Sequence, residues 1–169
     1  VNHFAYNDVR SHRFDNRITD VDSAVINMIQ PYKVTLDVKM NEVIGYNNKE
    51  LVKGKPSSTL TNWACDAVMN GYQNMTGKKV DVVLQNYGGI RINAFGAGDV
   101  TVGKIYEIMP FENYFVVLEA NGDITQQIFD KAAHLGGWPI SDNSSFVIKD
   151  SMATNIVIDG KPFDKNKTY

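Results

Sequence analysis

The segment LQNYGGIR, residues 84–91, combines residue types that suit an anionic ligand. Asn86 ends an apolar run, Gly88 and Gly89 follow, and Arg91 comes two residues later. Glycines permit a sharp turn and let a ligand approach the backbone closely. Arginine supplies a planar, permanently charged fork that suits phosphate or carboxylate. A tight turn followed by a surface arginine explains the same residues without a ligand, so this segment alone leaves both interpretations open.

A second segment, MPFEN at residues 109–113, carries groups that suit a nucleobase. Pro110 restricts the backbone, Phe111 offers a flat face for stacking, and Asn113 can both donate and accept hydrogen bonds at a base edge. The alternative is that Phe111 belongs to the core and that Asn113 caps an element. Read by itself, the segment fits either role.

Other kinds of site find little support in the sequence. The three histidines, His3, His12 and His134, are too scattered to form a paired metal-ligand motif, and His134 is expected to lie near a helix end. There is no nucleophile elbow, P-loop or Cys–His pair. The single cysteine, Cys65, excludes an internal disulfide and is expected to be a small buried apolar residue. We therefore expect recognition by this chain and not catalysis by it alone.

The composition is that of one globular domain without a strong charge bias. The chain has 169 residues, 43% of them hydrophobic, which is enough to bury a sizeable core. It has 17 basic and 19 acidic residues, so it lacks the excess positive charge that binding of a nucleic acid polymer requires. No apolar run reaches transmembrane length, and a chain that begins with valine looks trimmed, as after removal of a leader.

The hydrophobic pattern predicts an α+β fold. Residues 1–20 have no periodicity and are interpreted as a connecting arm that packs through three aromatic residues, Phe4, Tyr6 and Phe14. Helices are predicted over about 22–43, 58–76 and 122–135, the first of them kinked or divided at Pro31. Strands are predicted at residues 43–46, 50–53, 80–84, 114–120, 145–149 and 155–158. The pair Asp159-Gly160 then predicts a hairpin turn.

Four segments, taken in order, resemble the C-terminal domain of the 5'-nucleotidase family, which also contains UDP-sugar hydrolases and 2',3'-cyclic phosphodiesterases. They are TNWACDAVM, VDVVLQNYGGIR, TVGKIYEIMPFEN and IDGKPF. The pair NxGGIR and PFxN, about twenty residues apart, is the specific part of the resemblance. It places a domain of this kind at residues 21–169, with an interdomain arm at residues 1–20. We expect the domain to lack the family's last segment, which carries a GGDG motif and a second stacking aromatic.

The resemblance implies a division of labour between two domains. An N-terminal metallophosphoesterase domain with two metal ions hydrolyses the substrate, and the C-terminal domain holds the nucleoside or nucleotide. The DxH and GNH[DE] metal motifs are not in this sequence, so no cofactor is expected in this chain, and divalent metal ions are expected in the partner domain. The resemblance also implies a periplasmic, cell-surface or secreted location.

The implied substrate-binding residues are those of the two segments, together with one lysine. Arg91 would lie near the phosphate, Phe111 would stack under the base, and Asn113 would bond the base edge. Asn86 would position the substrate, while Gly88 and Gly89 bring the backbone close to it. Lys55 stands near the place of a family arginine and supplies a point charge without a bidentate fork.

Tyr87 replaces a residue that is commonly small in the family. The missing family arginine and the missing second stacking aromatic support a second hypothesis, a stand-alone nucleoside-binding or protein-interaction module that has lost hydrolase function. A third hypothesis, phosphatase activity of this chain alone, requires activity without an added partner.

Overall fold

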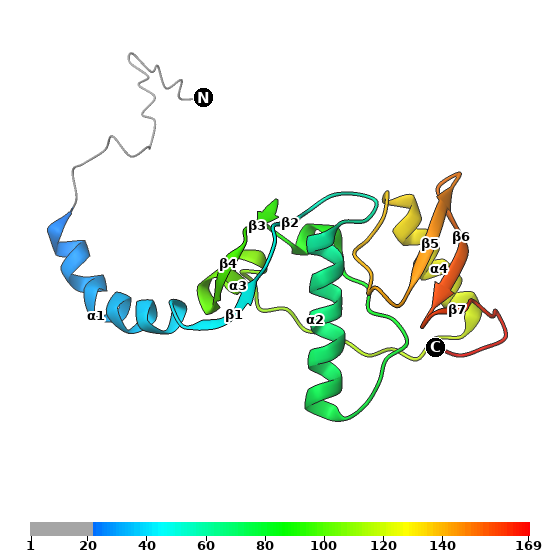
Figure 1. Cartoon of the computed structure of the whole chain (residues 1–169), viewed down its shortest axis with the longest axis horizontal. Helices are drawn as coiled ribbons and strands as arrows, with labels where there is room; N and C mark the ends of the chain where they lie inside the picture. Colours follow the sequence, from blue (N-terminus) through cyan, green and yellow to red (C-terminus); the bar gives the residue numbers. More distant parts are fainter. Residues whose placement is uncertain (1–21) are drawn as a thin grey trace, which may run out of the picture. The chain divides into compact units, whose positions relative to one another are not determined.

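The computed structural model describes residues 22–169 (Figure 1). The chain divides into two units, Val1–Val38 and Lys39–Tyr169, and each is described by itself. The predicted arm lies outside the described residues, as do its aromatic residues Phe4, Tyr6 and Phe14 and the histidines His3 and His12.

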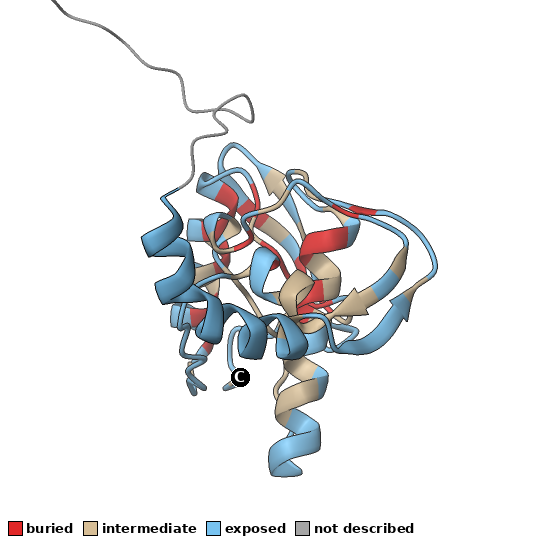
Figure 2. Ribbon diagram, turned by 90° about the vertical axis from the view of Figure 1, so that its left-hand side faces the viewer, coloured by how far each residue is buried: buried red, intermediate tan, exposed pale blue. Residues whose placement is uncertain are grey.

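Helix α1, Ser23–Met40, confirms the first predicted helix. It begins after Asp22, whose carboxylate accepts hydrogen bonds from the backbone N–H groups of Ala24 and Val25, at 2.9 and 3.3 Å. The helix is continuous through Pro31, so the division into two helices does not occur. None of its residues is buried (Figure 2).

The second unit combines three small antiparallel sheets with three α-helices and a short 3-10 helix, which confirms the predicted α+β class. Strand β1 (Val43–Asn47) pairs with β4 (Gly98–Thr101), and β2 (Leu51–Val52) pairs with β3 (Ala94–Phe95). The third sheet has the order β5 (Ser145–Lys149), β6 (Met152–Ile158), β7 (Lys161–Pro162). The helices are α2 (Thr59–Thr76), α3 (Val102–Ile108) and α4 (Gly122–His134).

The buried residues form two apolar clusters (Figure 2). In the first, Leu60 of α2 packs with Ile90, the residue that follows the two glycines, and with Ile108 at the end of α3. In the second, Phe129 of α4 lies against the sheet of β5 and β6 and contacts the Phe146 ring edge-on, with centroids 5.4 Å apart. The first cluster fixes the backbone of the glycine segment, because Ile90 has no exposed surface.

Two helix ends and one turn follow from the chemistry of neighbouring residues. Asn121 caps α4 by accepting a hydrogen bond from the N–H of Ile124 at 3.0 Å. Gly77 ends α2 with φ of 71°, in the left-handed region that favours glycine. Asp159 and Gly160 have φ of 51° and 69° and connect β6 to β7, which confirms the predicted hairpin turn.

Two predicted strands are wrong. Residues 80–84 form only one isolated bridge, between Leu84 and Ile140. Toward residues 80–83, the N–H of Val83 donates to the side-chain oxygen of Ser141 at 3.0 Å and not to a main-chain carbonyl. On the other side of the bridge, Pro139 accepts a bond from the N–H of Gln85 but has no N–H to return, so the ladder extends in neither direction. Residues 114–119 form no regular element and pair with no strand of residues 22–169. An apolar run bounded by turn residues has the composition of a strand, but this pattern does not show whether a second segment pairs with it.

Candidate functional site

The two glycines belong to a short 3-10 helix, η1 (Tyr87–Gly89). The chain turns here, as expected, but neither glycine is among the residues with positive φ, so this turn does not depend on the left-handed region that glycine favours. The reason for glycine at position 89 is space. A Cβ there would lie 3.1 Å from both Asn86 Oδ1 and Gln85 Nε2, which is closer than ordinary packing. Gly89 therefore makes room for the side chains of Asn86 and Gln85.

Main-chain hydrogen bonds tie the glycine segment to its neighbours. The N–H of Arg91 donates to the carbonyl of Ile108 at 2.8 Å, which joins the segment to the end of α3. The carbonyl of Ile90 accepts a bond from Lys53 Nζ at 2.5 Å. Gln85 Nε2 lies 2.8 Å from the sulfur of Met109, so a side chain also links the segment to MPFEN. The fold thus brings the two predicted segments together.

Arg91 and Phe111 are in contact. The guanidinium carbon of Arg91 lies 5.2 Å from the centroid of the Phe111 ring, which is the geometry of a cation–π interaction. The Phe111 side chain is 56% exposed, so the alternative in which it belongs to the core is wrong. The exposed Asn113 side chain donates to the carbonyl of Phe111 at 3.3 Å. An aromatic face, a charged fork and an amide therefore lie close together.

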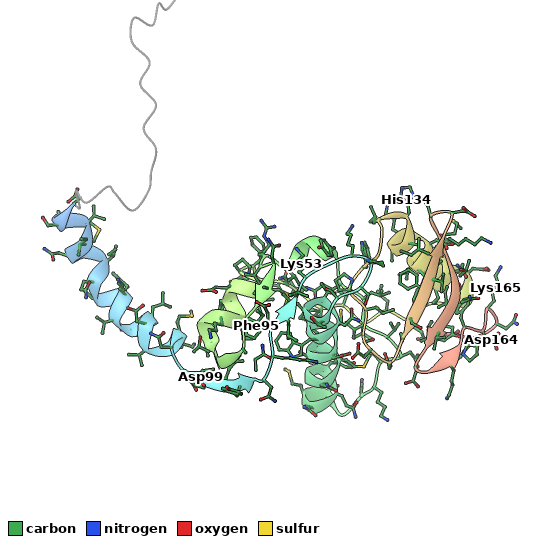
Figure 3. The ribbon with its side chains drawn as sticks, turned by 45° about the horizontal axis from the view of Figure 1, so that its top comes forward. Lys53, Phe95, Asp99, His134, Asp164 and Lys165 are labelled. Carbon is green, nitrogen blue, oxygen red and sulfur yellow. The ribbon has the colours of Figure 1, made fainter. Side chains whose placement is uncertain are left out.

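Two lysines gather around Tyr87. Lys53 Nζ and Lys55 Nζ lie 4.3 and 4.9 Å from the centroid of its ring. Lys55 Nζ also donates to the carbonyl of Leu135. Lys53, labelled in Figure 3, follows β2 directly. The sequence analysis named Lys55 as a binding residue but not Lys53 or Tyr87. The signal for Lys53 was the sequence KGK, which places the two lysines on alternate residues.

The local charge is positive. Within residues 22–169, the recorded ion pair joins Lys165 to Asp123, and none joins a carboxylate to Lys53, Lys55 or Arg91. Three cations near one short helix, without a described carboxylate to neutralise them, favour a negatively charged ligand. Because the overall charge of the chain is nearly balanced, an anionic ligand would need a local group of cations of this kind.

A cavity of about 400 Å³ lies elsewhere, where α2 begins. It is lined by Lys49, Leu51, Ser57, Ser58, Thr59, Asn62, Trp63, Asp66 and Asp142. None of the predicted site residues lines it. The candidate site is placed at η1 and not in this cavity, because the cations and the exposed aromatic ring gather there.

Asp66, in that cavity, is expected to make stability depend on pH. Burial raises the pKa of Asp66, although its Oδ1 accepts a hydrogen bond from the N–H of Asp142 at 2.8 Å. Because the pKa of Asp66 is raised in the folded state, the contribution of Asp66 to folding stability is full at low pH. That contribution is lost as the pH rises through the folded-state pKa. Asp66→Asn, which keeps an acceptor for Asp142, should therefore gain stability relative to the unchanged protein as the pH rises from about 3 to about 7. Urea unfolding across this range measures the difference, and a constant difference would contradict the assignment.

The described part of the chain offers no metal site. No group of three His, Cys, Asp or Glu side chains in residues 22–169 is placed to hold a metal ion. His134 lies in the last turn of α4, the position expected for a histidine near a helix end (Figure 3). Cys65 is fully buried, as expected, and this burial raises the pKa of its thiol to about 12. None of the helices described is both long and apolar enough to cross a membrane.

Comparison with known proteins gives a consistent result. Residues 40–169 match the family model described as "5'-nucleotidase, C-terminal domain". Among curated proteins, Protein UshA of Yersinia enterocolitica is 28% identical over 156 residues, which cover 88% of this chain and 27% of that protein. The chain spans about a quarter of the length of the curated relatives that it matches at greatest coverage.

Two solved structures share the fold. The 5'-nucleotidase precursor from Thermus thermophilus superposes with a TM-score of 0.64 at 24% identity, covering 85% of this chain and 31% of that one. The NAD nucleotidase of Haemophilus influenzae superposes with a TM-score of 0.61 at 18% identity, covering 88% and 31%. At these identities the likeness concerns the architecture, and it agrees with the α+β class.

Proposed function

Because the chain belongs to the family of 5'-nucleotidase C-terminal domains, we propose that its second unit is the substrate-recognition part of a nucleotide phosphohydrolase. One observation carries the proposal: the Arg91 guanidinium lies over the exposed Phe111 ring, next to the segment that Lys53 and Lys55 surround. A nucleoside monophosphate needs two features in its binding site: an aromatic face for the base and a group of cations for the phosphate.

The proposed ligand lies with its base on the Phe111 ring and its phosphate toward the cations. Arg91 covers one face of the ring, so the base stacks on the other face or displaces the guanidinium. Asn113 bonds the edge of the base, since its amide can donate and accept. Asn86, whose side chain lies over Gly89, holds the part of the ligand between base and phosphate together with the backbone at Gly88.

Hydrolysis belongs to another domain or chain in this proposal. A metallophosphoesterase partner supplies divalent metal ions that activate the attacking water, and residues of this chain bind and orient the nucleotide. The names of the relatives favour a nucleotide as substrate. A periplasmic, cell-surface or secreted location is part of the same proposal.

Calorimetric titration tests the proposal directly. Adenosine, AMP and inorganic phosphate are titrated separately into the chain, with and without magnesium, and release of phosphate from AMP is followed in parallel. We expect AMP to bind more tightly than adenosine, phosphate to bind weakly, and no phosphate to be released without a partner. Binding of neither adenosine nor AMP would contradict the proposal. Release of phosphate by the pure chain would contradict the division of labour.

A second candidate function is a protein-interaction module without a working nucleotide site. The contacts of the lysines favour it, because Lys53 Nζ and Lys55 Nζ already donate to the carbonyls of Ile90 and Leu135. If these bonds persist with ligand present, the lysines offer less to a phosphate. The same titrations separate the two candidates, since the interaction module binds neither adenosine nor AMP.

Replacement of Tyr87 tests how the lysines are held. Tyr87→Leu removes the ring over which both ammonium groups lie, and cation–π contacts at exposed sites contribute about 0.5–1 kcal/mol each. We therefore expect AMP binding to weaken by roughly two- to tenfold, while adenosine binding changes little. Tyr46→Leu is the control, because Tyr46 lies on β1 and is 68% exposed. An equal loss for AMP and adenosine would show that Tyr87 contacts the nucleoside and not the lysines alone.

A further inference from the structure

The cavity of about 400 Å³ at the start of α2 takes no part in the proposed nucleotide site. Its walls come from three segments that are separated in the sequence: Lys49 and Leu51, the first turns of α2 with the residues just before them, and Asp142. All of these belong to the second unit, and none lies near either end of the chain. The packing of well-separated described segments therefore builds this cavity.

One part of the cavity wall is apolar. Leu51 is buried, and the Trp63 ring stacks on Phe95, with ring centroids 5.8 Å apart and an angle of 17° between the ring planes. Phe95, labelled in Figure 3, is itself buried. These contacts hold the indole in place, and an indole is the aromatic surface to which a cation binds best.

Another part of the wall carries two carboxylates that hydrogen bonds hold in place. The backbone N–H of Asp142 donates to Asp66 Oδ1 at 2.8 Å, and Asn62 Nδ2 donates to Asp142 Oδ1 at 3.4 Å. Asn62 Nδ2 also donates to Ser57 Oγ at 3.1 Å, which fixes the amide. An ionised carboxylate can accept about four hydrogen bonds. Within residues 22–169 each of these two carboxylates accepts one, so both can accept further bonds from a donor in the cavity.

The negative charge of these carboxylates is not neutralised by a described ion pair. The pair recorded within residues 22–169 joins Lys165 to Asp123, and neither residue lines the cavity. Burial raises the pKa of Asp66, and the negative charge of Asp142 raises it further. A cation bound between the two carboxylates removes this repulsion and favours the ionised form of both.

The wall suits an organic cation better than a metal ion. No group of three His, Cys, Asp or Glu side chains in residues 22–169 is placed to hold a metal ion. The cavity is also far larger than a single ion, and the surfaces of Leu51 and Trp63 favour an apolar chain next to the charge. A primary ammonium group has three N–H donors, which match the free acceptor positions of two carboxylates.

We propose that the cavity at the start of α2 binds a small organic ammonium compound. Its N–H groups donate to Asp66 and Asp142, and its carbon chain lies along Trp63. This binding function is separate from nucleotide recognition at η1 and does not depend on it.

The test uses n-butylammonium chloride as the probe and nuclear magnetic resonance as the readout. The indole N–H resonance of Trp63 in the isotope-labelled chain is followed at pH 7.5 and low salt. Trp138, the other tryptophan, does not line the cavity and is the internal reference. We expect a saturable shift for Trp63 with a midpoint near 1 mM. The neutral 1-butanol and the anionic butyrate, which have similar chains, should shift it at least tenfold less at equal concentration.

Charge-removing variants make the test specific for this cavity. Asp66→Asn, which keeps an acceptor for the N–H of Asp142, and Asp142→Asn should each weaken butylammonium binding by roughly fivefold or more. Asp99→Asn is the matched control, because Asp99 is exposed on β4 and does not line the cavity (Figure 3). Lys49→Gln should have the opposite effect and tighten binding by about twofold or more, since it removes a positive charge from the wall.

The change of sign between the aspartate and lysine variants separates a binding role from a structural one. Circular dichroism should be the same for all four variants. The proposal would be overturned by the absence of a saturable shift up to about 20 mM, by an equal shift with 1-butanol, or by unchanged binding in both aspartate variants. Displacement of butylammonium by calcium chloride at equal ionic strength would also overturn it, because the two carboxylates would then form a metal site.

Discussion

Phe111→Ala is expected to weaken binding of adenosine and AMP by the same factor, roughly five- to 150-fold. The reason is that stacking of a base on an aromatic side chain contributes about 1–3 kcal/mol, and alanine removes the whole ring. Because Phe111 is 56% exposed, its removal should cost little stability. Calorimetric titration of both ligands into the variant and the unchanged chain measures the effect.

Phe115→Ala is the matched control for this substitution. Phe115 is the same residue type, lies four positions away and has nearly the same exposure, 58% against 56%. It makes no described contact with Arg91, so its loss should leave nucleoside binding unchanged. If Phe115→Ala weakened binding as much as Phe111→Ala, the base would not be located on the Phe111 ring. If neither did, the site would not use aromatic stacking.

Arg91→Ala is expected to weaken AMP binding by roughly 10- to 150-fold without weakening adenosine binding. Hydrogen bonds to charged groups contribute about 1.5–3 kcal/mol, and this contribution exists only when the ligand carries a phosphate. Adenosine binding is preserved because the adenine base stacks on the Phe111 ring and not on Arg91. The guanidinium lies 5.2 Å from the ring centroid, and stacking of the base does not require it. Arg91→Lys should give an intermediate result, since lysine keeps the charge but loses the bidentate geometry.

A control for the change of charge is Lys131→Ala, in the last turn of α4. It removes one positive charge from an exposed position that has no described contact with η1, so AMP binding should change little at moderate salt. The double variant of Arg91 and Phe111 adds a further test. If the phosphate and the base are held independently, the two losses for AMP should add, apart from the direct Arg91–Phe111 contact. Equal losses for adenosine and AMP in Arg91→Ala would mean that Arg91 does not hold the phosphate.

Local residue chemistry made several elements predictable. The three- and four-residue spacing of apolar side chains indicated α1, α2 and α4, because a helix gathers such residues on one face. Asn121 caps the start of α4 through its own side chain, and Asp159-Gly160 predicted the β6–β7 turn. These features depend on residues close in sequence, so the sequence alone carries the information that they need.

Strand pairing could not be predicted in the same way. Residues 80–84 and 114–120 have the composition of strands, but a strand exists only where another segment returns its hydrogen bonds. In the first segment the N–H of Val83 bonds the Ser141 side chain in place of a main-chain carbonyl, and in the second only Ala120 finds a partner, Tyr169, among the residues described. The amino-acid pattern of one segment does not specify its distant partner.

The candidate site shows the same division. The sequence determined the family, the α+β class and the chemical types at the site, because NxGGIR and PFxN are local patterns that carry an amide, an aromatic ring and a guanidinium. Only the tertiary structure decided that Arg91 lies over Phe111, that Lys53 joins Lys55 around Tyr87, and that Gly89 is needed for space and not for its φ. The physical reason is that these contacts depend on how η1, the end of α3 and the loop after β2 pack around the buried Ile90 and Ile108, which are distant in the chain and adjacent only in the fold.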